Sequence, residues 1–216
     1  MEKPEVYVLR EGDLVTKGIN TYAPATVSII DTSEGLFLVD VGSAADGTLK
    51  KENGRTYYEP YLGDWLSEAK FNVEEIVGII LTHNHPDHAA LANPILSGVD
   101  PSIPVYGPDS IYRLYNAKHS YQQPLKEGEE LVTGVKVIKL PGHESSLDQG
   151  VLVDTDEGLT AIVGDAFLRL SEYNAPEDFS LWPPNDKGLA LESRKKIIGL
   201  ESVKVIIPGH DSGFYI

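Results

Sequence analysis

The chain contains no cysteine. Without thiols it cannot build a disulfide framework, and no thiolate can bind a metal ion. Any metal site in this protein must therefore use imidazole, carboxylate or water ligands.

Long hydrophobic runs and basic residues are also scarce. No run of 18 or more apolar residues occurs, which argues against a membrane partner, and the first five residues do not resemble a secretory leader. Lys and Arg number 18 against 33 Asp and Glu, and the net charge of −15 opposes binding to nucleic acid. We expect a cytoplasmic protein that acts on a small molecule. Its 216 residues, 41% of them hydrophobic, suffice for one core, so we expect residues 1–216 to form a single domain.

Histidine is rare as well, yet it is concentrated in short motifs. Five of the six histidines lie either in the stretch Leu81-Thr-His-Asn-His-Pro-Asp-His88 or in two Pro-Gly-His motifs. Ligand number, type and context together identify a metal site. The candidate ligands are His83, His85, Asp87, His88, His143, Asp165 and His210.

The spacing of the first motif has a physical explanation. Residues 77–82 form an apolar run that is typical of a buried strand. Residues two apart in an extended chain point the same way, so His83 and His85 can face one ion. Pro86 ends the strand, and a turn toward a helix at Asp87 would direct Asp87 and His88 to a second position. One loop can therefore serve two ions.

The later candidate ligands also follow apolar, strand-like runs. His143, Asp165 and His210 come after residues 135–140, 159–163 and 203–207, and each lies beside a glycine. Strand ends with glycine-permitted turns can project ligands toward one point. We therefore expect both halves of the chain to contribute to one site.

Other segments complete the expected arrangement of elements. Strands are predicted at residues 6–10, 26–31, 36–41 and 150–154 and near Val105, with a hairpin turn at residues 32–35. Helical segments are predicted within residues 57–70, 109–118 and 189–200, and the cluster Arg194-Lys-Lys196 is expected to be exposed. This cluster is the only basic run that favours a nucleic acid partner.

With these motifs the chain resembles the metallo-β-lactamase superfamily over nearly its full length, and within it the short members related to metallo-β-lactamase domain-containing protein 1. The resemblance implies an α+β fold, the four-layered αββα sandwich. It is carried by Leu38-Val-Asp-Val-Gly42, the residues 83–88, Gly164-Asp-Ala166, Glu192-Ser-Arg-Lys-Lys196 and Pro208-Gly-His210.

The resemblance also implies an assignment of the ligands. His83, His85 and His143 would hold one divalent ion, Asp87, His88 and His210 the other, and Asp165 would bridge them. A hydroxide shared by the ions would be the nucleophile, which makes Asp87 and Asp165 the candidate catalytic residues. Zinc is the favoured metal, with iron and manganese as alternatives. Asp40 is interpreted as a turn former or as a residue that orients a ligand.

These features favour a metal-dependent hydrolase of a small ester, thioester, lactone or phosphoester. The alternatives are a nuclease or phosphodiesterase, a mononuclear iron persulfide dioxygenase using His83, His143 and Asp165, and a binding protein without turnover. Asp165 and the lack of cysteine argue against a true β-lactamase. The diiron oxygen-reducing members of the superfamily carry a glutamate at the position of His85, so the histidine argues against membership of that group. A homodimer, the role of His119 and that of the aromatic loop 171–187 are left open.

Overall fold

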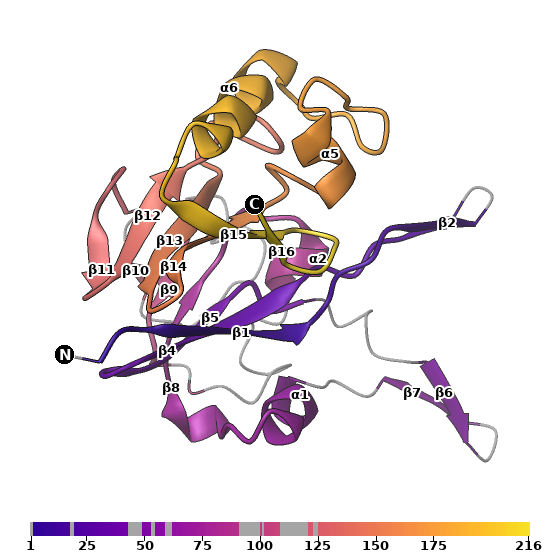
Figure 1. Ribbon diagram of the computed structural model, residues 1–216. Coiled ribbons are helices and arrows are strands. Elements are labelled where there is room, and N and C mark those ends of the chain that lie inside the picture. The colour runs from indigo at the N-terminus through magenta and orange to yellow at the C-terminus, as the bar shows by residue number, and fades with distance from the viewer. Residues whose placement is uncertain are drawn as a thin grey trace.

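The architecture consists of two six-stranded β-sheets packed face to face (Figure 1). The computed structural model describes residues 2–17, 20–42, 49–52, 55–58, 62–90, 100, 102–108, 121–122 and 125–216. None of the helices in these segments has the length and apolar run needed to cross a membrane. The predicted helix at residues 109–118 and His119 lie outside the described residues.

The first sheet is built mainly from the N-terminal half of the chain. Its antiparallel part joins three strands, and a parallel part extends it. In spatial order the strands are β1 (Glu5–Arg10), β4 (Val27–Thr32), β5 (Gly35–Val39), β8 (Ile76–Ile80), β9 (Val105–Tyr106) and β10 (Tyr121–Gln122).

The second sheet comes from the C-terminal half. All its neighbours are antiparallel except β14 and β15, which run parallel. In spatial order the strands are β11 (Glu130–Val132), β12 (Val135–Lys139), β13 (Gln149–Thr155), β14 (Gly158–Gly164), β15 (Val203–Pro208) and β16 (Phe214–Tyr215).

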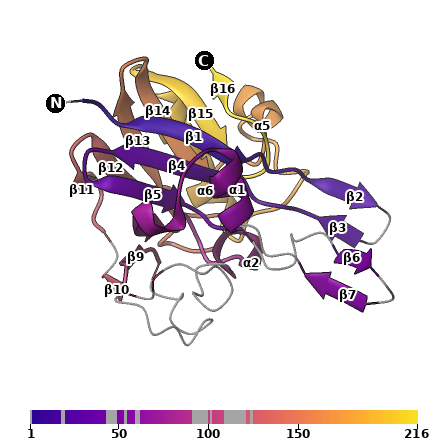
Figure 2. The same cartoon turned by 90° about the horizontal axis from the view of Figure 1, so that it is seen from below.

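Two hairpins stand apart from the sheets. They are formed by β2 (Val15–Lys17) with β3 (Asn20–Tyr22), and by β6 (Leu49–Glu52) with β7 (Arg55–Tyr58). Both project from the same side of the sandwich (Figure 2).

Three apolar clusters show how the layers are held together. One packs helix α1 (Leu62–Glu68), through Leu62 and Leu66, against the outer face of the first sheet. A second lies between the two sheets. The third packs helix α6 (Lys187–Ile198), through Ile197, against the outer face of the second sheet. The predicted αββα sandwich is therefore confirmed (Figure 1).

Most predicted elements form close to their expected bounds, and one prediction needs correction. The helix predicted within residues 57–70 is present as α1, which begins at Leu62, after the hairpin strand Arg55–Tyr58. The expected exposure of Arg194 is wrong. Helix α6 buries the face that contains Ala190, Ser193, Arg194 and Ile197, so Arg194 is 2% exposed.

Short helices α2 (Pro86–Ala89) and α5 (Leu170–Asn174) flank the strand ends where the candidate residues gather. The turn toward a helix that was predicted near Asp87 is present. Pro86 occupies its first position, where the missing N–H costs nothing, and His85 is the N-cap.

Candidate metal centre

The seven residues predicted from the motifs come together at one edge of the sandwich. His83 and His85 follow β8, Asp87 and His88 lie in α2, and the other three follow β12, β14 and β15. Their ligand atoms form two groups, and within each group the atoms lie within 4.8 Å of one another. The first contains His83, His85, His143 and Asp165, and the second contains Asp87, His88 and His210.

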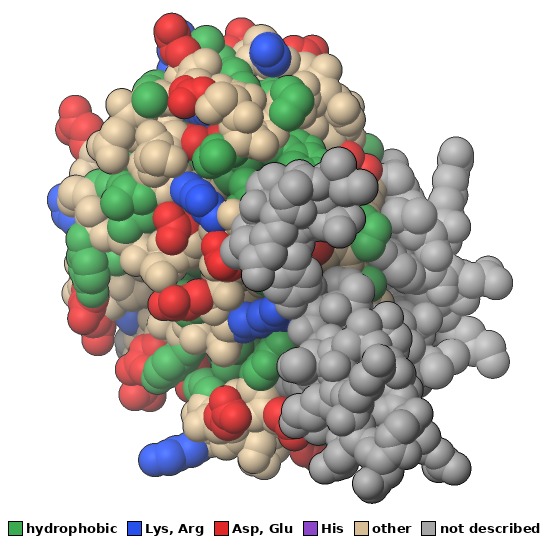
Figure 3. All heavy atoms as spheres, turned by 90° about the vertical axis from the view of Figure 1, so that its right-hand side faces the viewer, with side chains coloured by type: hydrophobic (Ala, Val, Ile, Leu, Met, Phe, Trp, Pro, Cys, Tyr) green, Lys and Arg blue, Asp and Glu red, His purple; other side chains and the backbone are tan. Residues whose placement is uncertain are grey.

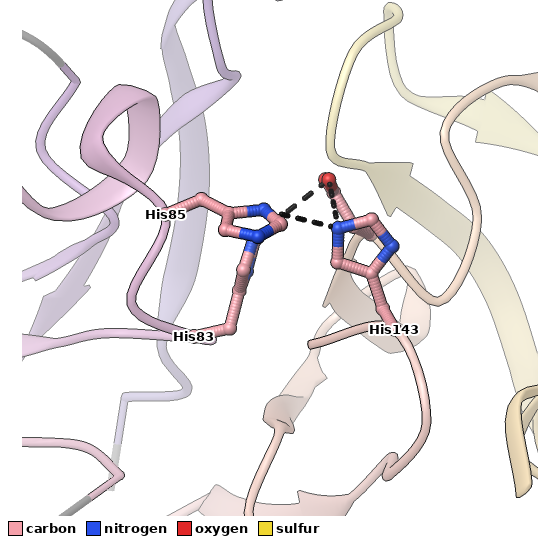
Figure 4. Close-up of side chains that lie close together, drawn as sticks. His83, His85 and His143 are labelled. Carbon is pink, nitrogen blue, oxygen red and sulfur yellow. Dashed lines mark hydrogen bonds and ion pairs between the residues drawn. The ribbon is translucent and has the colours of Figure 1, made fainter. Parts of the chain in front are cut away.

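In the first group the three imidazoles and the carboxylate are directed toward one another (Figure 4). His143 Nε2 lies 3.0 Å from Asp165 Oδ2 and 3.1 Å from His85 Nδ1. His83 Nε2 lies 3.7 Å from the same carboxylate oxygen. These four side chains therefore present three nitrogens and one oxygen to a common point.

The second group is built around His88 and His210, whose Nε2 atoms are 3.4 Å apart. Asp87 Oδ2 lies 3.5 Å from His210 Nε2 and 3.8 Å from His88 Nε2. Asp165 Oδ1 is 3.1 Å from His88 Nε2 and 3.4 Å from His210 Nε2. Asp165 thus contacts both groups, one with each carboxylate oxygen.

Asp40 connects one imidazole of each group to the first sheet. Its Oδ2 lies 2.8 Å from His88 Nδ1 and accepts a hydrogen bond of 2.9 Å from the Thr82 hydroxyl. Thr82 Oγ1 in turn lies 3.0 Å from His83 Nδ1. Asp40 has a φ of 54°, which is uncommon outside glycine. The backbone of Asp40 therefore forms a turn, and its carboxylate orients two of the candidate ligands. Both interpretations of Asp40, as a turn former and as an orienting residue, apply.

These contacts determine which ring nitrogens carry protons. A carboxylate only accepts, so His88 donates from Nδ1, and the Thr82 hydroxyl, already donating to Asp40, accepts from His83 Nδ1. His210 Nδ1 lies 3.0 Å from the carbonyl oxygen of Pro24, which also only accepts. In the neutral rings of His83, His88 and His210, the Nε2 lone pair therefore faces the site.

This arrangement fits cations. His83 Nε2 and Asp165 Oδ1 are buried and have no hydrogen-bond partner. The opposed lone pairs of His88 and His210 would repel one another without a positive charge nearby. Imidazole and carboxylate donors suit zinc, iron and manganese. An ion in each group would satisfy the unpartnered buried atoms, which otherwise cost free energy.

The electrostatics of the buried groups agree with this description. Burial raises the pKa of Asp165, but the imidazoles of His210, His88, His143 and His83 outweigh it and hold the pKa well below its usual range. Burial, together with the neighbouring imidazoles, lowers the pKa of His83. Asp165 is therefore ionised and His83 neutral at physiological pH, the forms that a metal ion requires.

Burial also lowers the pKa of His88, but the carboxylates of Asp165 and Asp40 outweigh it and leave a pKa well above the ordinary value. A proton on His88 is one source of the positive charge that this cluster favours. A bound cation would replace that proton.

Gly209 is required for this geometry. A Cβ atom at Gly209 would lie 1.9 Å from Asp165 Oδ1. The strand ends of β14 and β15 can therefore bring Asp165 and His210 together only if no side chain stands between them. This close approach explains the glycine in the second Pro-Gly-His motif.

The two halves of the site are joined by hydrogen bonds that the motifs did not reveal. Glu144 Oε2 accepts from the backbone N–H of Asn84, 3.0 Å away, between His83 and His85. The N–H of Gln149 donates to the carbonyl of Thr82 over 2.9 Å. The only sequence signal for Glu144 was its place directly after His143, and Thr82 was visible only as the last residue of a predicted strand.

The aromatic residues of loop 171–187 are either packed against other residues of the protein or exposed. Tyr173 packs edge-on against Phe167 and Phe214, and Phe179 stacks on Arg194. Trp182 is 43% exposed. Two of the three aromatic side chains therefore pack on their own protein.

Replacement of Thr82 by valine should loosen the first ligand group. The substitution removes the hydroxyl that joins Asp40 to His83 and leaves His83 free to change tautomer. We expect zinc affinity to fall about ten-fold, as measured by competition with a chromogenic chelator. Thr82→Ser keeps the hydroxyl and is the matched control. Equal affinities of the two variants would contradict the orienting role.

Comparisons with known proteins agree with the fold. The model of the metallo-beta-lactamase superfamily matches residues 21–210. No curated protein sequence matches the chain. A metallo-β-lactamase-like protein from Thermotoga maritima has 19% identity and a TM-score of 0.72, with 100% of both chains covered.

Two lactonases are also similar. An N-acyl homoserine lactone hydrolase, with the product N-hexanoyl-L-homoserine at its catalytic metal centre, has 19% identity and a TM-score of 0.69, covering 97% of this chain and 93% of that one. The dizinc quorum-quenching lactonase AidC has 17% identity and a TM-score of 0.65, covering 88% and 73%. At these identities the likeness concerns the fold.

Proposed function

The chain belongs to the metallo-β-lactamase superfamily, and from this premise we propose that it is a metal-dependent hydrolase of a small ester, thioester, lactone or phosphoester. The observation that carries the proposal is the pair of buried ligand groups that share Asp165. The lactonases of the same fold make lactones and related carboxylic esters the first substrates to test.

In this proposal each residue has a defined role. His83, His85 and His143 would hold one divalent cation, Asp87, His88 and His210 would hold the other, and Asp165 would contact both. Zinc is the favoured metal. Two divalent cations would polarise the substrate oxygen and lower the pKa of a water molecule, so that attack occurs near neutral pH.

The protein's own groups orient the reactants. Asp165, ionised among its imidazoles, would keep the two ligand groups at a fixed spacing and so orient the reactants. The Asp87 side chain, at 26% exposure against 4% for Asp165, is the more accessible carboxylate. Asp87 accordingly is the better placed of the two to exchange a proton with solvent.

Two observations bear on the nuclease alternative. Burial of Arg194 removes one of the three charges from the basic cluster on which that alternative rested. On the face shown in Figure 3, the described Lys and Arg side chains lie singly among acidic ones. A small-molecule substrate is therefore favoured.

Metal analysis combined with a substrate panel tests the proposal. Protein purified without chelator or added metal is analysed for elements and then assayed on N-acyl homoserine lactones, p-nitrophenyl esters, a thioester and a phosphodiester. We expect two zinc ions per chain and hydrolysis of at least one class. One iron per chain with oxygen uptake on persulfide would establish the dioxygenase instead. Two bound ions without turnover across the panel would indicate a binding protein.

A further inference from the structure

A buried arginine beside the metal centre has no role in the chemistry proposed above. Arg194 in α6 is 2% exposed, and the guanidinium lies 4.1 Å from the ring centre of Phe179 and 5.5 Å from that of Phe167. Burying a charge is costly, and a well-packed apolar side chain would often serve stability equally well. The retention of a charge here suggests a task other than stability.

The guanidinium holds three backbone carbonyls of the segment that follows Asp165. Arg194 Nε donates to the carbonyl of Ala166 over 2.8 Å, and Nη1 donates to those of Pro176 and Asp178 over 3.0 and 2.8 Å. Ala166 is the direct neighbour of Asp165 in the chain. The planar guanidinium spreads its donors over three nitrogens, so it reaches three carbonyls and still faces Glu172, whereas a lysine ammonium has three donors on a single nitrogen.

Glu172 extends this network to the other strand end. Glu172 Oε1 lies 2.8 Å from Arg194 Nη2, and Oε2 accepts from the backbone N–H of Leu168. The carbonyl of Leu168 accepts from the N–H of His210, 3.0 Å away. The peptide groups of Leu168 are therefore joined to Glu172 on one side and to His210 on the other.

We propose that Arg194 and Glu172 are positioning residues that hold Asp165 and His210 at the spacing needed for two metal ions. They act through the backbone of residues 166–179 and do not touch the ions. The inference rests on the proposed function in that it assumes a site that binds a metal pair. The carbonyl of Phe167, which accepts from Gly209 N–H over 3.0 Å, adds a further link between the same two strand ends.

The first test is Arg194→Lys, which keeps the charge but has only three donors, on one nitrogen, for the three carbonyls and Glu172. Zinc dissociation constants are measured by competition with a chromogenic chelator, and the visible spectrum of the Co²⁺-loaded protein reports ligand geometry. We expect the zinc dissociation constant of the weaker site to rise about ten-fold or more, the scale found for residues that orient ligands. The Co²⁺ spectrum should also change.

The second test is the double variant Arg194→Met, Glu172→Met, which leaves no unpaired buried charge and covers the case in which Arg194→Lys fails to fold. We expect the zinc dissociation constant of its weaker site to rise at least as much as in Arg194→Lys, whatever the denaturation midpoint of the variant. Val153→Ala is the control, because Val153 is buried between the sheets, at the end of β13 away from the ligand groups, and its loss also destabilises the fold. This control should change the zinc dissociation constants by no more than about two-fold, as expected for sites that are not in contact.

Unchanged zinc dissociation constants in the double variant, or an equal loss of affinity in Val153→Ala, would overturn the inference. The first result would mean that the pair does not position the ligands, and the second that any destabilisation has the same effect. Failure of the proposed function would instead be visible in the wild-type protein, as absence of a bound metal pair or of turnover.

Discussion

Asp165→Asn is expected to reduce hydrolysis about 10³-fold, the scale on which loss of a preorganised charge at a reacting centre slows an enzyme. Asp165 is the residue that contacts both ligand groups, and burial among four imidazoles keeps it ionised. Asparagine has almost the same shape but no charge, so it leaves the two cations without the anion between them. We expect the variant to retain one zinc ion per chain where the wild type binds two. The rate on the best substrate of the panel and the zinc content per chain are the measurements.

Asp154→Asn is the control for this experiment. Asp154 lies on the exposed surface of the second sheet and pairs with Lys3, so its substitution removes the same charge far from the candidate ligands. We expect the control to keep both its rate and two zinc ions. Undiminished hydrolysis in Asp165→Asn would remove the bridging carboxylate from the mechanism.

The sequence predicted the strands that present the site better than it predicted their surroundings. β8 and β14 are mostly buried apolar runs, and β12 and β15 are apolar except for lysines, of which Lys136 and Lys204 are exposed; such segments identify a strand with little help from distant residues. The candidate ligands follow these strands directly, so their convergence could be anticipated from strand ends and glycines. The geometry then required only that the two sheets face each other.

Other features depended on tertiary packing that a local pattern does not encode. Arg194 follows Ser193 in a helix whose Lys195 and Lys196 are exposed, and nothing local distinguishes the three basic residues. Arg194 is buried where it binds carbonyl groups contributed by residues 166–178, and no periodic pattern in that segment predicts the contact. The link from Glu144 to Asn84 likewise joins residues 60 positions apart.

The start of α1 shows a third limit of the sequence. The helix predicted within residues 57–70 is confirmed by α1, but the sequence did not locate its first residue, because Tyr57 and Tyr58 pair with Lys50 and Leu49 in a hairpin. Aromatic residues favour strands when a partner strand is available. The partner came from a segment for which no strand had been predicted, so the boundary could not be located from the chain alone.

Removal of both metal ions should lower the melting temperature by about 16–32 °C relative to protein in zinc at 1,000 times the dissociation constants. Ligand binding at that excess stabilises the folded state by about 4 kcal/mol per site. For a domain of this size each kcal/mol corresponds to about 2–4 °C. Without the ions this stabilisation is lost, and the buried His83 Nε2 is left without a partner. Calorimetry with chelator, followed by re-addition of zinc, measures the change.

The dependence on zinc concentration counts the ions. Above saturation, each ten-fold rise in free zinc adds about 1.4 kcal/mol for every ion that the folded protein binds and the unfolded chain does not. The melting temperature of the wild type should therefore rise about twice as steeply with the logarithm of zinc concentration as that of Asp165→Asn, if that variant keeps one ion. Equal slopes would mean that Asp165 does not decide whether the second ion binds. A melting temperature unaffected by chelator would mean that the two buried groups are stable without a cation, which their unpartnered atoms argue against.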